Sequence, residues 1–173
     1  MRSFLVICAF WFGCTLAGMA SADFNGTWVV DLTASDSPEP ILKRLGASWF
    51  QRRLATSLKV EATYRQTKDR LTILTRAPAF SRTEEFWLDG RPVTKKESLT
   101  GPYTERTFWS ADGARLISIS AFRTKDGKDA RLRVARQLAD KGGTLLLGET
   151  LDVAGEPPQP VVRRIWHRKG AAD

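Results

Sequence analysis

The feature that most constrains the fold of this chain is a succession of ten short segments with strand character, separated by turn residues. Residues 58–66 show the clearest alternation of apolar and polar side chains, which is typical of an antiparallel strand with one buried face. The expected strands cover residues 24–32, 58–66, 70–76, 82–88, 91–98, 103–110, 115–124, 129–138, 144–153 and 161–168. So many strands in one domain must close or nearly close, because an open sheet would leave exposed edges. The expected fold is therefore all-β, a ten-stranded antiparallel up-and-down β-barrel.

Two turn signals set the expected connections near the middle of the chain. Asp89 and Gly90 predict a tight two-residue hairpin between the fourth and fifth strands. Gly101 and Pro102 predict a break before the sixth strand. The sequence contains no internal repeat and no low-complexity linker, so we expect one domain.

One stretch, residues 37–56, departs from the β pattern and predicts helix. Ser37 suits the N-cap, Pro38 suits the first helical position, and Glu39 places negative charge in the first turn. The apolar side chains recur at helical spacing and form one face, made by Ile41, Leu42, Leu45, Trp49, Phe50 and Leu54. Gly46 predicts a break between two short helices. We therefore expect a helix-turn-helix between strands 1 and 2 that plugs the open end of the barrel or packs across one sheet.

The first 22 residues predict a signal peptide rather than part of the fold. Arg2 gives a short basic start, residues 4–17 are mostly apolar but too few to span a bilayer comfortably, and residues 20–22 form a small-x-small cleavage site. The expected organisation is a signal peptide over 1–22 and a barrel domain over 23–173. This predicts a periplasmic or secreted protein.

Both cysteines, Cys8 and Cys14, lie within this leader. A lipoprotein acylated at Cys14 is the alternative to a cleaved secretory protein, although Trp11 and Phe12 suit that signal poorly. The rest of the chain has no thiol, which excludes disulfides, thiolate metal sites and cysteine nucleophiles there.

The chain without its leader is basic, with 26 Lys and Arg against 19 Asp and Glu, a net charge of about +7. Outside the cytoplasm such a charge indicates an acidic ligand, an anionic envelope polymer or an anionic membrane surface before it indicates nucleic acid. The alternative is that the charge only keeps the protein soluble.

Arg136 is the most informative irregularity in the strand pattern. In segment 129–138 it shares its face with apolar residues, so it should point into the barrel. An unpaired guanidinium there is costly and needs a partner. The partner is a ligand carboxylate, an internal acid such as Glu85 or Glu149, or ordered water; otherwise the register slips near the strand end.

The last strand supplies a second candidate pair, Arg164 and Trp166. They share one face, and Arg163 and His167 share the other, so periodicity alone does not decide which arginine points inward. An inward Arg164 would place a cation beside the indole N–H of Trp166. The alternative is a cation that packs on a surface aromatic ring.

The sequence offers no catalytic or metal site. His167 is the only histidine and has no serine or carboxylate partner at a motif spacing. Acidic residues on the strands, including Glu84, Glu85, Glu97 and Glu105, are expected to be solvated or paired with arginines. We expect no catalytic residues, no metal and no cofactor.

The order of these elements resembles the intracellular fatty-acid-binding proteins and, more broadly, the lipocalin-like calycins. The resemblance rests on Phe24-Asn25-Gly26-Thr27-Trp28, on a helical hairpin containing Leu42-Lys43-Arg44-Leu45-Gly46, and on the nine strands that follow. It covers essentially the whole chain after the leader. The chain also resembles secreted bacterial proteins that open with a Gly-Thr-Trp strand, share a calycin-like barrel and have no established ligand.

The resemblance implies a ten-stranded barrel with a helical lid and a fatty acid or other apolar ligand in its cavity. It implies that Arg136 and the Arg164-Ile165-Trp166 segment hold the carboxylate, with Trp166 where the family has tyrosine. It also implies that Trp49 and Phe50 of the lid lie over the cavity mouth, and that Trp28 is core at the closed end.

The expected function is thus non-enzymatic binding and transport of a small hydrophobic ligand with an acidic head group by a monomer. The alternative is a protein of a different functional class, a packed barrel that acts as an envelope interaction module through its basic outer surface. Non-specific nucleic-acid binding is suggested by the charge and the six tryptophans, but the export signal opposes it. A carrier needs a cavity of several hundred Å³, which a packed barrel lacks.

Overall fold

The computed structural model describes residues 21–78, 80–97 and 99–170. Within them the chain forms ten strands, two α-helices and one 3-10 turn. The elements are β1 Gly26–Asp31, α1 Glu39–Arg44, α2 Trp49–Ser57, β2 Glu61–Gln66, β3 Arg70–Ala77, β4 Phe80–Trp87, β5 Val93–Glu97, β6 Gly101–Trp109, β7 Arg115–Arg123, β8 Asp129–Ala139, η1 Asp140–Gly142, β9 Thr144–Val153 and β10 Val162–Arg168. The all-β fold and the helical hairpin between the first two strands are confirmed. The predicted leader lies outside the described residues except for Ser21 and Ala22.

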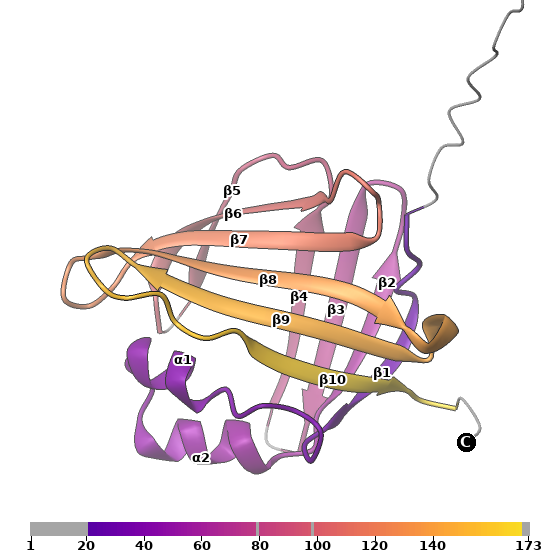
Figure 1. The fold of residues 1–173 in the computed structure, drawn as a ribbon, viewed down its shortest axis with the longest axis horizontal. Coiled ribbons are helices and arrows are strands. Elements are labelled where there is room, and N and C mark those ends of the chain that lie inside the picture. The colour runs from indigo at the N-terminus through magenta and orange to yellow at the C-terminus, as the bar shows by residue number, and fades with distance from the viewer. Residues whose placement is uncertain (1–20, 79, 98, 171–173) are drawn as a thin grey trace, which may run out of the picture.

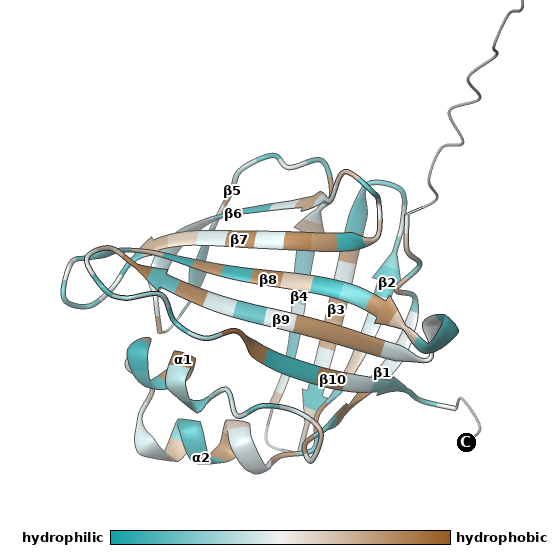
Figure 2. Ribbon diagram, viewed as in Figure 1, coloured by the Kyte–Doolittle hydropathy of each residue, from teal (hydrophilic) through white to brown (hydrophobic). Residues whose placement is uncertain are grey.

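The strands form one antiparallel sheet that curls into a barrel. Its order is β4-β3-β2-β1-β10-β9-β8-β7-β6-β5, so strands that follow one another in sequence pair, except β4 and β5, and β1 also pairs with β10. Figure 1 shows β7 to β10 running across the front of the molecule, with β2 to β4 crossing behind them and both helices at one end. Figure 2 shows hydrophilic and hydrophobic residues alternating along β7 and β8, whereas β9 begins with a continuous hydrophobic stretch.

The sheet is open between β4 and β5, which lie at its two ends and share no ladder among the described residues. The predicted hairpin at Asp89 and Gly90 is therefore wrong. Gly90 does adopt a positive φ of 78°, but Asp89 forms an isolated bridge with Phe108 of β6, and the Gly90 amide donates to the Thr107 carbonyl at 2.9 Å. The long-range pairing with β6 overrides the local turn preference, and a gap results.

Pro102 lies inside β6, opposite Lys96 of β5, and not in a break before the strand as predicted. β5 is an edge strand and Pro102 stands near the start of β6. The missing amide hydrogen is tolerated at such a position.

The closed end of the barrel is filled by large side chains. Trp28 and Phe24 are fully buried, which confirms Trp28 as core. The indole Nε1 of Trp28 donates to the Phe24 carbonyl at 3.0 Å, and the rings of Phe24 and Trp109 stack with centroids 5.8 Å apart. The burial and hydrogen bonding of these aromatic residues leave no space for a ligand at this end.

The helical hairpin forms for local reasons. After α1, Gly46 takes a φ of 79°, and the amides of Gly46 and Ala47 donate to the carbonyls of Lys43 and Leu42, which is a Schellman ending. Ser48 then caps α2 through a reciprocal capping box with Gln51. The predicted break at Gly46 is confirmed. At the start of α1 the N-cap is Pro38 and not Ser37, although the Ser37 hydroxyl still accepts from the Glu39 amide.

Trp49 and Phe50, which the resemblance places over the cavity mouth, are exposed residues of α2, and their place over the mouth stays a prediction. Their side chains are 69% and 63% exposed. The capping box fixes where α2 begins, and Arg52 turns toward α1, where it donates to the Ala47 carbonyl and pairs with Glu39. Arg52 thus packs between the two helices, while Trp49 and Phe50 remain exposed.

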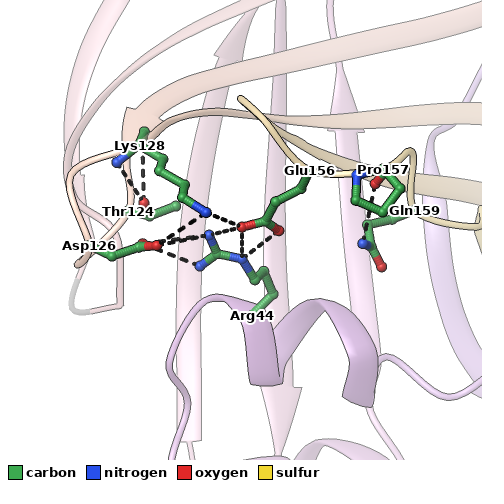
Figure 3. A network of polar contacts seen from close by, with 7 residues as sticks. All are labelled: Arg44, Thr124, Asp126, Lys128, Glu156, Pro157 and Gln159. Carbon is green, nitrogen blue, oxygen red and sulfur yellow. Dashed lines mark hydrogen bonds and ion pairs between the residues drawn. The ribbon is translucent and has the colours of Figure 1, made fainter.

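A charged network holds α1 against two loops of the barrel (Figure 3). Arg44 pairs with Glu156, which follows β9, at 2.6 Å and with Asp126, which follows β7, at 3.4 Å. Lys128 also pairs with Glu156, at 2.9 Å. Arg44, followed by Lys128, lowers the pKa of Glu156 from 4.5 to about 2.

The first prediction concerns this network. The folded-state pKa of Glu156 lies below its usual value, so its contribution to stability is present above about pH 4.5 and is lost as the pH falls toward 2. We expect Glu156→Gln to lower the midpoint of thermal unfolding at pH 7, and we expect the difference from the wild type to disappear near pH 2. Circular dichroism melts at several pH values measure this. Glu61→Gln, which removes an exposed partner of Lys169, is the control, and an equal loss at pH 7 and pH 2 contradicts the prediction.

The second prediction concerns the exposed aromatic residues of α2. Because Trp49 is largely solvent-exposed, Trp49→Ala should change the free energy of unfolding by no more than about 0.5 kcal/mol. By contrast, Trp28→Ala should cost about 3–5 kcal/mol. Urea denaturation measures both values. A loss of more than about 2 kcal/mol for Trp49→Ala would show that Trp49 packs against the barrel in solution.

Candidate ligand-binding site

An internal cavity of about 270 Å³ lies between the layers of the barrel, next to the end of α1. Leu45 is its contact with the helical hairpin, in place of Trp49 or Phe50. Strands β4 to β9 and the loop before β6 supply the rest of the lining: Arg82, Glu84, Phe86, Glu97, Leu99, Thr100, Tyr103, Glu105, Ser118, Ser120, Phe122, Leu132, Val134, Arg136, Leu147 and Glu149. This lining combines an apolar part with an unusual number of charged groups.

Strand register places both predicted arginines on the inner face. Leu147 of β9 is paired with Arg136 of β8 on one side and with Arg164 of β10 on the other. Directly paired residues share a face of the sheet, and Leu147 lines the cavity. The same argument applies to Trp166, which is paired with the fully buried Leu145. The question that periodicity left open is answered: Arg164 and Trp166 face inward, whereas Arg163 and His167 are exposed.

Arg136 is buried, with 6% of its surface exposed. Its Nη1 donates to the Ser118 hydroxyl at 2.9 Å, and that hydroxyl is 2.9 Å from the Thr107 hydroxyl. Its guanidinium carbon lies 5.0 Å from the centre of the Phe86 ring. Its Nε has no hydrogen-bond partner. The protein thus holds part of the guanidinium, and the Nε–H is left without a partner.

Arg164 and Trp166 are half-buried in the wall beside the cavity and do not line it directly. The Nε of Arg164 and the indole Nε1 of Trp166 are buried and lack a hydrogen-bond partner. Burial lowers the pKa of Arg164, and the charge of Glu149 opposes that shift. A positive charge at this place is therefore poorly compensated.

The two acids considered as internal partners of Arg136 differ in position. Glu85 is exposed and lies 3.8 Å from Arg70 on the outside, so it does not pair with Arg136. Glu149 lines the cavity, and within the described part of the chain no ion pair joins it to Arg136 or Arg164. Burial raises the pKa of Glu149, although the charges of Arg164 and Arg136 oppose the rise. Its carboxylate faces the cavity while protein surrounds the rest of the side chain.

A second group of charges lies at the gap between β4 and β5. Arg82 pairs with Glu84 at 3.0 Å and with Glu97, and Lys95 pairs with Glu105. An open groove of about 920 Å³ runs along this gap. It shares Arg82, Glu84, Glu97 and Tyr103 with the cavity lining, so the groove adjoins the cavity.

Sequence reasoning missed the role of these residues. Glu84 and Glu97 do pair with an arginine, as expected, but they also line the cavity. Glu105 is 6% exposed and pairs with a lysine, and burial raises its pKa. The available signal was that Glu105 shares its strand face with Tyr103 and Thr107, a pattern that also fits an outer face.

The acidic residues and His167 are spread over the described chain. Among residues 21–78, 80–97 and 99–170, no three His, Cys, Asp or Glu side chains gather into a group that could hold a metal ion. His167 is exposed and lies 3.3 Å from Asp31 at the surface. Neither helix among these residues has the length and apolar character needed to cross a bilayer.

Comparison with solved structures identifies the fold. Human cRBP IV matches with a TM-score of 0.65 and 22% identity, over 85% of this chain and 98% of that chain. Lipid binding protein 8 of Caenorhabditis elegans, solved in the apo state, matches with a TM-score of 0.65 and 15% identity, over 84% of this chain and 95% of that chain. A Schistosoma mansoni fatty acid binding protein in complex with arachidonic acid matches with a TM-score of 0.62 and 18% identity, over 84% of this chain and 95% of that chain.

No protein-family model and no curated protein matches the sequence. The structural matches nevertheless span nearly the whole of each neighbour and include both the strands and the helical hairpin in one order. The chain has the calycin fold of the fatty-acid-binding and cellular retinol-binding proteins.

Proposed function

We propose that this protein binds a small hydrophobic ligand with an acidic head group, a fatty acid or a similar lipid, and catalyses no reaction on it. One observation carries the proposal. Three buried N–H donors, on Arg136, Arg164 and Trp166, lack a partner in the described part of the chain and come from the inner faces of β8 and β10. Buried donors without partners are costly, and a ligand carboxylate would satisfy them with charge-assisted hydrogen bonds.

The balance of charge supports the same proposal. At the gap, Arg82 faces two carboxylates and Lys95 faces one. Deeper in the barrel, the charges of Arg136 and Arg164 both act on Glu149, and the charge of Arg136 also acts on Glu105. Because Glu105 is already paired with Lys95, Glu149 is left to balance two arginines, and a ligand carboxylate would supply a second negative charge.

The apolar part of the cavity suits the rest of such a ligand. Phe122 and Leu132 line the cavity and pack in the apolar cluster with Ile41 of α1, and Leu45 at the end of α1 joins them. The volume of about 270 Å³ is just below the range of about 300–1,000 Å³ that is usual for ligand pockets. We therefore favour an acid of medium chain length. A barrel packed with side chains, the alternative class, is not expected to contain such a cavity.

The structural neighbours are consistent with this proposal, because one of them is a fatty acid binding protein with arachidonic acid bound. We further propose that the protein acts as a monomer in the periplasm or extracellular space, with an anionic membrane surface rather than nucleic acid as its second partner. The basis is the leader and the net charge.

The third prediction concerns export. Cleavage after Ala22 would remove the Ala22 carbonyl, which accepts from Gln66 Nε2 at 3.0 Å. It would keep Phe24, the first fully buried side chain. We therefore expect a stable mature chain that begins at Asp23, and the intact mass of the secreted or periplasmic protein measures this. A full-length chain, or one acylated at Cys14, contradicts it.

The fourth prediction tests the function. If Arg136 and Arg164 hold a ligand carboxylate, Arg136→Leu and Arg164→Leu should each weaken decanoate binding by about 2–3 kcal/mol, because each removes a charge-assisted bond in a poorly screened place. Binding of decanol should hardly change. The free energy of unfolding of the empty protein should stay equal or rise, because a poorly compensated buried charge is removed.

Calorimetric titration and urea denaturation measure the two quantities. Arg163→Leu, an exposed arginine on the outer face of β10, is the matched control and should change neither. If both inner variants lose about 3–5 kcal/mol of stability and keep their affinity, the arginines serve internal acids and the proposed function is wrong.

A further inference from the structure

A row of polar side chains crosses the inner face of the barrel next to the two arginines. Val134 of β8 is paired with Ser118 on one side and with Glu149 on the other. Ser118 is in turn paired with Thr107. Thr107, Ser118 and Glu149 therefore stand at one level of the barrel, one step along the strands from Arg136 and toward the helices.

The members of this polar row differ in how they are satisfied. Ser118 accepts from Arg136 and shares a hydrogen bond with Thr107. Glu149 lines the cavity and has neither a hydrogen bond nor an ion pair to any described residue. The other lining carboxylates are held by protein cations, Glu84 and Glu97 by Arg82 and Glu105 by Lys95.

This position makes Glu149 a neighbour of any ligand whose carboxylate reaches the arginines. The ligand must pass Glu149 to place its tail against Leu132 and Leu45, which lie nearer the helices. A plain alkyl chain would cover the carboxylate and exclude water from it without offering a hydrogen bond, which is costly. A hydroxyl or amide N–H at the same point would donate to it.

We propose that Glu149 makes the site selective for acids that carry a hydroxyl or N–H donor close to the carboxylate. This inference rests on the proposed function and adds a ligand class to it. Residues of one face are roughly 7 Å apart along a strand, and the side chains of Arg136 and Glu149 both reach into the cavity between them. A hydroxyl or N–H group two or three bonds from the ligand's own carboxylate fits this spacing. A 3-hydroxy acid of medium chain length is the simplest such ligand.

The test compares decanoate with 3-hydroxydecanoate by calorimetric titration of the wild-type protein. A hydrogen bond to Glu149 predicts about tenfold tighter binding of the hydroxy acid. Equal affinities, or tighter binding of decanoate, overturn the inference and leave the proposed function intact. If neither acid binds, the proposed function fails and this inference fails with it.

Variants then assign the preference to Glu149. Glu149→Leu should remove the preference and keep or improve decanoate binding, because the uncovered acceptor is gone. Glu149→Gln retains an acceptor and should keep part of the preference. Glu61→Gln, an acid paired with Lys169 at the outer surface, is the control and should leave both affinities unchanged. A preference that persists in a folded Glu149→Leu variant overturns the assignment.

Discussion

Two guanidinium groups on the inner face of one sheet are the constraint on which the interior of this barrel depends. Leu147 separates Arg136 from Arg164 in a single row. Charges in such a place are costly unless polar groups or a ligand surround them. The apolar core accordingly divides into two clusters. One lies at the closed end around Trp28, and the other lies under α1 around Ile41, Leu151 and Val162.

The space between these clusters is where a protein without the arginines would place more aliphatic side chains. Here it contains a cavity, a chain of hydroxyl groups and a carboxylate. The polarity of the interior and the presence of a cavity thus have one cause. The guanidinium of Arg136 is held by the Ser118 hydroxyl and the Phe86 ring. Side chains placed for these contacts cannot also fill the surrounding volume to the density of an apolar core.

Much of the fold and part of the site could be predicted from the sequence because strand alternation is strong. In β8 the apolar residues recur at every second position around Arg136, so its inward direction follows from the pleat. In β10 both faces carry an arginine, and only the pairing of Arg164 with Leu147 and of Trp166 with Leu145 decides between them. Register between distant strands is not encoded in the periodicity of one strand.

Other features depend on contacts that local patterns do not contain. Asp89 and Gly90 have the composition of a hairpin, but the bridge from Asp89 to Phe108 directs the chain to β6. Trp49 and Phe50 belong to a continuous apolar face only if the two helices share one axis. The Schellman ending at Gly46 and the new cap at Ser48 break that axis, so the face predicted for one helix does not continue into the next.

The gap between β4 and β5 has a consequence for colloidal behaviour. Both strands are sheet edges, and unpaired edges are templates for association with other chains. In this molecule Lys95 donates to the Glu85 carbonyl of β4, and Arg82 and Glu97 join the two edges through their side chains. These charged side chains oppose strand pairing with another molecule, as charges on edge strands do in other β proteins. The groove beside the cavity therefore lies between two protected sheet edges, and any motion that widens it exposes both edges at once.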